Sequence, residues 1–177
     1  MKSISTLAVI GLLLFACKLC SFTGNTNRTL PGSSPSTGSY ARDFIKPKLG
    51  SFTLIKSYTK EETRKTASGL AIKLLDQSED AAAGEYKSDS VKSVVLMTCA
   101  YSSPDTPASL IDDMEKDMRR SSAWRTVTNV PQQSGRRIEA EDSKGNGLVI
   151  WNNGYWLFMT IGDSPSTTSS LADGVGY

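Results

Sequence analysis

The chain has 177 residues, of which 38% are hydrophobic and 21% are charged, and its formal net charge at pH 7 is only +2. This composition is typical of a globular protein with one buried core, and so weak a charge argues against electrostatic attraction of nucleic acid. Histidine is absent, which removes the commonest general base and the commonest transition-metal ligand. We therefore expect no nucleic-acid partner, no cofactor and no metal site.

The N-terminal segment has the parts of a secretory signal peptide. Lys2 supplies a positive charge, and apolar residues follow from Leu7 to Ala16. This apolar run is too short to cross a bilayer, which needs about twenty residues, but it fits the apolar region of a cleaved signal peptide. We therefore expect residues 1–16 to be removed.

The residues before Cys17 resemble the lipobox of bacterial lipoproteins, in which a branched, a variable and a small residue precede the cysteine; here they are Leu14, Phe15 and Ala16. The resemblance implies that Cys17 receives diacylglyceryl on its sulfur and, after cleavage, an acyl group on its nitrogen. Two or more acyl chains give stable anchoring, whereas one gives marginal binding. Lys18 follows in place of an aspartate, which by the same resemblance favours the outer membrane, on its periplasmic side or surface. An ordinary cleaved signal peptide with incidental cysteines and an uncleaved anchor are the alternatives.

Three cysteines leave two further possibilities to weigh. Cys17 and Cys20 have C-x-x-C spacing, but a redox pair needs a strand-to-helix setting and a polar tail follows here instead. Cys20 could pair with Cys99 in an oxidising envelope. Because Cys99 lies in a strongly apolar segment, we expect a buried, unreactive thiol instead.

Composition divides the mature chain into two parts. Residues 17–40 begin with the lipidated cysteine and continue as a tether rich in serine, threonine, glycine and proline, with too few apolar residues to fold. Residues 41–177 have the length and composition of a single α+β domain. The tether would hold this domain away from the membrane.

Six segments of the domain predict strands. The clearest pair flanks Asn153-Gly154, a favoured two-residue hairpin turn. Counting outward from that turn places Trp151 opposite Trp156. The other four predicted strands are Phe52–Ile55, Val91–Tyr101, the WRTVTNV segment from Trp124, and the alternating segment around Ile138 and Ala140.

Helical signals are fewer. Thr106 is a candidate cap before Pro107, and an apolar stripe follows with helical spacing: Leu110, Ile111, Met114 and Met118. A weaker helix is expected over Thr168–Asp173. The segment Glu61–Asp76 is ambiguous, because its first half resembles a helix whereas Leu70, Ile72 and Leu74 could alternate in a strand.

These elements predict an α+β fold: an antiparallel sheet of five to six strands with one main helix packed across it, and possibly a second, C-terminal helix. The element order resembles small α+β domains of bacterial envelope lipoproteins and, at fold level, the photosystem II extrinsic protein PsbP. Fold resemblance of this kind assigns no site residues.

No motif for catalysis is convincing. Ser57-Tyr-Thr-Lys60 spells S-x-x-K but ends a strand and lacks its partner motifs. Gly162-Asp-Ser164 resembles the nucleophile block of an esterase family that also needs a histidine. Carboxylates cluster near Asp112 and near Glu139, but both sets fit solvent-exposed faces and neither has the spacing of a calcium loop. A histidine-free hydrolase would need a carboxylate pair or a Ser–Lys pair in a pocket.

Both faces of the Trp hairpin are apolar. One carries Val149, Trp151, Trp156 and Phe158, and a large exposed apolar patch is rare in a monomer. Either the terminal helix or the segment Ala41–Leu49 covers this second face, or the four residues form a groove for an apolar ligand or an envelope protein. We therefore predict a lipid-anchored, non-enzymatic binding module. A structural or assembly accessory with exposed sheet edges is the alternative.

Overall fold

The computed structural model describes residues 40–67, 69–89, 91–132 and 135–175. They form one eight-stranded sheet in the order β1-β2-β3-β4-β8-β7-β6-β5, and every neighbouring pair is antiparallel. The strands are β1 (Lys48–Leu49), β2 (Phe52–Thr59), β3 (Asp80–Ser88), β4 (Val91–Ala100), β5 (Trp124–Val130), β6 (Arg137–Asp142), β7 (Gly147–Asn153) and β8 (Trp156–Gly162). The helical segments are η1 (Ala41–Phe44), α2 (Lys60–Thr66), α3 (Leu70–Gln77), α4 (Asp105–Arg120) and α5 (Pro165–Val175).

The prediction of five to six strands with one main helix is wrong, although the described residues do form an antiparallel sheet with helices packed on it. The missed strands are β1, which has two residues, and β3, in which three alanines and Gly84 follow Asp80. Alanine and glycine have low strand propensity. Position 84 also requires glycine, because a Cβ there would lie 2.8 Å from the Ile45 side chain and 2.7 Å from the Tyr86 ring. Pairing with β2 and β4, and not local propensity, therefore accounts for the extended conformation of β3.

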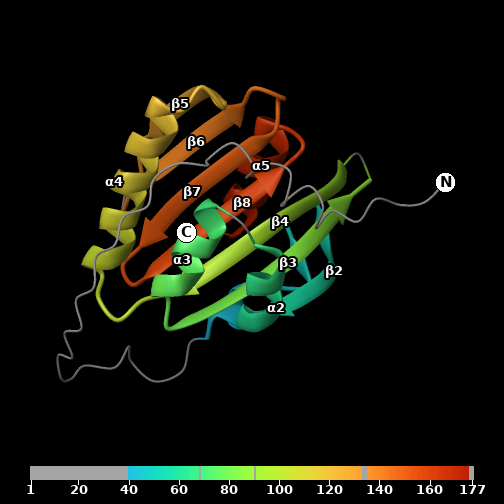
Figure 1. The fold of residues 1–177 in the computed structure, drawn as a ribbon. Helices are drawn as coiled ribbons and strands as arrows, with labels where there is room; N and C mark the ends of the chain where they lie inside the picture. The colour runs from blue at the N-terminus through green and yellow to red at the C-terminus, as the bar shows by residue number, and fades with distance from the viewer. Residues whose placement is uncertain (1–39, 68, 90, 133–134, 176–177) are drawn as a thin grey trace.

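Helices cover both faces of the sheet. Figure 1 shows α2, α3 and α4 on the face toward the viewer and α5 behind the sheet. The first three enclose one core cluster, in which Leu74 and Leu75 of α3 and Ile111 and Met114 of α4 are fully buried. Helix α5 and η1 enclose a second cluster on the opposite face. The domain therefore has three layers, with β4 and β8 at the centre of the sheet.

The ambiguous segment Glu61–Asp76 lies within two consecutive helices, so the strand alternative for Leu70–Leu74 is wrong. Thr59 caps α2 in a reciprocal box: its hydroxyl accepts from the Glu62 amide, and the Glu62 carboxylate accepts from the Thr59 amide at 2.9 Å. Gly69, with φ +52°, precedes α3. This positive φ is a conformation that favours glycine.

The predicted hairpin is present, but its register differs from the prediction. Trp151 faces Phe158, not Trp156, and Asn153 faces Trp156. The two loop residues are Gly154 and Tyr155, and Gly154 has the positive φ of +56° that such a loop favours. A shift of this size moves each partner by two residues, so every side chain keeps the face that alternation gave it.

The main helix begins at Asp105 after Pro104, so the predicted cap at Thr106 is wrong. Its apolar stripe is confirmed, because Leu110, Ile111, Met114 and Met118 are all buried. The C-terminal helix is longer than the predicted Thr168–Asp173. It begins after Ser164, whose hydroxyl accepts from the Thr167 amide at 3.3 Å. Among the described residues, no helix is long and apolar enough to cross a membrane.

Candidate functional site

The four hairpin residues predicted to bind a ligand belong to the core. Val149, Trp151 and Phe158 are at most 2% exposed, and Trp156 is half-buried. Trp151 stacks on Phe158, with ring centroids 5.0 Å apart, and Phe44 of η1 packs edge-on against Trp156 at 4.7 Å. Helix α5 and η1 therefore cover this face, which confirms the first of the two alternatives that the sequence leaves open. Cys17, the predicted lipidation site, lies outside the described residues.

A groove of about 810 Å³ lies elsewhere on the same face of the sheet, between η1 and the adjoining ends of β2, β3 and α2. Its lining includes small residues from the two strands, namely Ser57, Thr59 and Ala82. Strand pairing sets Thr59 opposite Ala82, so these side chains lie side by side. Helix α5 packs mainly on β7 and β8, and η1 packs on β3 and β4. At this side of the sheet Ala82 of β3 is buried, whereas Ser57 and Thr59 at the end of β2 are exposed.

The groove is lined by more acidic than basic side chains, although the chain as a whole has a net charge of +2. The acidic residues are Asp43, Glu61, Glu62, Glu79 and Asp80, and the basic residues are Arg42 and Lys60. A concave surface lined mainly by one sign of charge concentrates the electrostatic field and favours ligands of the opposite sign. The groove is therefore suited to a cation.

Several of these charged groups also hold the walls in place. The Asp80 carboxylate accepts from the Ala41 amide at 2.8 Å, and the Ala41 carbonyl accepts from the buried Thr98 hydroxyl at 2.8 Å. The hydrogen bond from the Thr59 amide lowers the pKa of Glu62. The Lys60 ammonium group donates to the Ser78 carbonyl. The walls are therefore ordered by bonds that do not involve a ligand.

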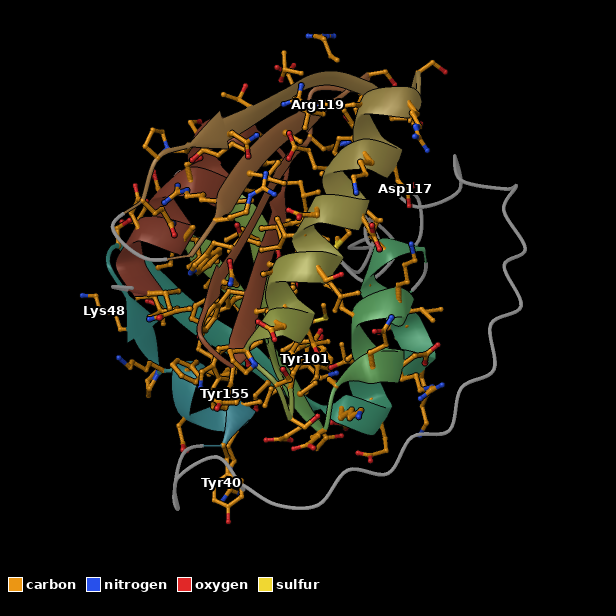
Figure 2. All side chains as sticks on the ribbon, turned by 90° about the vertical axis from the view of Figure 1, so that its left-hand side faces the viewer. Tyr40, Lys48, Tyr101, Asp117, Arg119 and Tyr155 are labelled. Atoms are coloured by element: carbon orange, nitrogen blue, oxygen red, sulfur yellow. The ribbon has the colours of Figure 1, made fainter. Side chains whose placement is uncertain are left out.

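Tyr40 stands at the rim of the groove. Its side chain is 56% exposed, and the Arg42 guanidinium lies 5.0 Å from the centre of its ring. Figure 2 shows Tyr40 projecting from the lower end of the domain, below Tyr155. An exposed aromatic ring of this kind can contact a further cation.

The residues of the two catalytic motifs are engaged in other contacts. Ser57 and Lys60 both line the groove, but among the described residues no hydrogen bond joins them, and Lys60 is engaged by Ser78. Ser164, from Gly162-Asp-Ser164, caps α5. Neither serine therefore has the activated neighbour that nucleophilic catalysis needs.

The two predicted carboxylate clusters form ion pairs and turns. Glu115 of α4 pairs with Arg136 at 2.6 Å and with Arg119 at 2.8 Å. On the same helix, Asp117 points toward α3 (Figure 2), where it meets Lys73 at 3.2 Å. In the part of the chain that the structure describes, no group of three or more acidic or cysteine side chains is placed to hold a metal ion.

Asp142, from the second cluster, is buried and closes the β6–β7 turn. Its carboxylate accepts from the amides of Lys144 and Asn146 and from the Asn146 side chain, at 2.8 to 2.9 Å. In the same cluster, Glu139 pairs with Arg137 at 2.6 Å. Both carboxylates therefore have structural roles.

An apolar cavity beneath α2 and α3 is too small to be a ligand site. Its volume is about 20 Å³, roughly the space that one water molecule needs. At its edge the Tyr58 hydroxyl donates to Glu85 at 3.1 Å, and burial together with this carboxylate raises the pKa of Tyr58 to about 12. Nearby in the same core, Cys99 is a free, fully buried thiol, and burial raises its pKa to about 12. The predicted burial of this thiol is therefore confirmed.

Comparisons with known proteins add a single fold-level likeness. No family model matches the chain, and no curated protein matches it. Among solved structures, the chain is similar to a GTP binding regulator from Thermotoga maritima, with a TM-score of 0.49 and 10% sequence identity over 76% of this chain and 81% of that chain. A likeness this distant assigns no activity to the chain.

Proposed function

We propose that this chain is a lipid-anchored protein of the bacterial cell envelope whose domain is a non-enzymatic binding module. The anchor rests on the sequence: an apolar signal segment, the residues Leu14-Phe-Ala16 before Cys17, and a polar tether after it. Lys18 after the cysteine favours the outer membrane. The observation that carries the binding role is the groove between η1 and β2, because its walls are already ordered and it is open.

A non-enzymatic role is supported by how the reactive side chains are used. Lys60 donates to a main-chain carbonyl, Ser164 caps a helix, and Glu115 is held in ion pairs. These are structural contacts that folding requires, and none leaves a base beside a nucleophile.

The anchor is tested by the intact mass of the protein extracted from membranes, beside a Cys17→Ala variant. The expected result is loss of residues 1–16 with added acyl chains, and disappearance of that lipid in the variant. Cys20→Ala is the matched control and should keep the lipid. A mature protein without acyl chains, or lipid that survives Cys17→Ala, would overturn the anchor. If the lipid is found, separating the inner and outer membranes will show which of them holds the lipidated protein.

A structural or assembly accessory is the second candidate, and one observation favours it. Strand β5 pairs with β6 on one side, and no strand of the described residues lies on its other side, so part of its main chain is available to another protein. Substitution of Thr128 by proline at this edge should disrupt envelope complexes if β5 assembles with a partner. Unchanged complexes in native gels would exclude this role for β5.

A further inference from the structure

We propose that the groove between η1 and β2 binds an extended, cationic segment of a partner protein. This inference rests on the proposed function as a binding module, since it names the ligand class of the same site. Three observations support it: the sign of the charge around the groove, the free main chain at its wall, and the exposed ring of Tyr40 at its rim.

The charge argument concerns the ligand's sign. Five carboxylates and two cations line the groove, so an anionic segment would be repelled and a cationic one attracted. Of these carboxylates, Asp43, Glu62 and Asp80 accept hydrogen bonds from main-chain amides, which keeps them fixed in place. Glu61 and Glu79 also line the groove, and both are exposed. Neither takes part in the main-chain hydrogen bonds described above. They are the charges to remove in a test.

The main chain of β2 argues for a peptide over a small cation. Strand β1 pairs with only Phe52 and Thr53 of β2, whereas β3 pairs with β2 from Thr53 to Thr59, apart from one bulge. Within the described residues, 56–58 therefore have a strand on one side and none on the other. Ser57 and Tyr58 line the groove. A peptide in the groove can hydrogen-bond to this edge as an added strand.

The same edge limits how far the pairing extends. A bulge lies between Leu54 and Lys56, and α2 begins at Lys60, where the Thr59 amide is already bonded to Glu62. Bulges of this kind protect an edge from indiscriminate pairing. Main-chain pairing therefore covers a short stretch of peptide, and charge and the ring of Tyr40 supply the rest of the recognition.

The test is fluorescence anisotropy with the lipidated full-length protein in detergent. The probe is a labelled peptide of alternating lysine and serine, and its counterparts replace lysine by glutamate or by glycine. The basic peptide should bind tightest, and added salt should weaken its binding. The double variant Glu61→Gln/Glu79→Gln should weaken it roughly three- to tenfold, as expected for two exposed charge pairs. The control Asp113→Asn/Asp117→Asn removes equal charge from α4 and should leave the affinity within about twofold.

Two further probes separate a peptide from any cation. A basic peptide with N-methylated main-chain amides should bind several-fold more weakly, and spermidine should compete poorly. Equal binding of the N-methylated peptide, or full displacement by spermidine, would overturn the peptide assignment. A neutral or acidic peptide that binds as tightly would overturn the charge argument but leave the groove as a binding site. Absence of binding by every peptide would overturn both this inference and the groove's role in the proposed function, whereas the lipid anchor is judged separately by the mass of the protein.

Discussion

Substitution of Trp151 by alanine distinguishes a core residue from a binding residue. The sequence leaves Trp151 either beneath the terminal helix or the segment Ala41–Leu49, or on a ligand surface. The structure places its side chain at 2% exposure, stacked on Phe158 at an interplanar angle of 15°. Because Trp151 is packed in the core, the substitution acts on folding. If the residue lies on an open face, the substitution would leave stability nearly unchanged.

The magnitude follows from burial and stacking. Replacing a buried tryptophan by alanine costs about 3–5 kcal/mol, because transfer energy is lost and a cavity remains. Loss of the stacked pair lies within that range, at about 0.5–1.5 kcal/mol. Domains are stable by about 5–15 kcal/mol, so Trp151→Ala should remove a large part of the total. The Phe158 ring and the α5 side of the core should loosen with it.

The assay is urea unfolding followed by far-UV circular dichroism. With a slope of about 2 kcal/mol per molar urea, a loss of about 4 kcal/mol lowers the midpoint by about 2 M. Tyr155→Ala is the matched control on the same hairpin. Its side chain is 38% exposed, so its effect should stay within about 0.5 kcal/mol. A Trp151→Ala midpoint equal to that of Tyr155→Ala would refute the packing described for this face.

Three further predictions concern other parts of the fold. Gly147→Ala should cost about 2–3 kcal/mol in thermal unfolding, because its Cβ would lie 2.4 Å from a main-chain oxygen of the loop before α5; Gly154→Ala, which has open space but a positive φ, should cost about 1–2 kcal/mol. Glu115→Ala should lower the free energy of unfolding in urea by about 1–3 kcal/mol, because it removes the partner of Arg136. Asp113→Ala is the control, since Asp113 forms only an exposed ion pair with Lys116. Equal losses of stability in the two variants would contradict a structural role for the Glu115–Arg136 pair. The buried thiol of Cys99, with its pKa raised from 9.0 to about 12, should resist iodoacetamide until the protein unfolds. Because the folded state binds this thiol proton more tightly, the thiol's contribution to stability is complete below pH 9 and is lost as the pH rises from 9 to 12. Alkaline unfolding of the parent protein should therefore be steeper over this pH range than that of Cys99→Ala.

The sequence predicted those helices and strands that carry a regular hydrophobic pattern over a few consecutive turns or residues. The apolar stripe from Leu110 to Met118 specifies a helix with one buried side. Alternation around Gly154 specifies a hairpin and assigns each side chain to a face. The predicted start of α4 lies two residues too late, because the cap is Pro104 and not Thr106; capping signals define such a boundary only loosely.

The sequence by itself determined the periodic elements, the buried state of Cys99 and the residues that resemble a lipidation signal. Tertiary structure decided the rest. Alternation cannot distinguish registers that differ by two residues, so only packing with Phe158 fixed the partner of Trp151. Strand β3 is alanine-rich and takes its conformation from β2 and β4. The groove joins residues 40–62, from η1, β2 and α2, to residues 79–82 at the start of β3. Only the packing of the elements leaves the end of β2 exposed beside them, and no local pattern shows this.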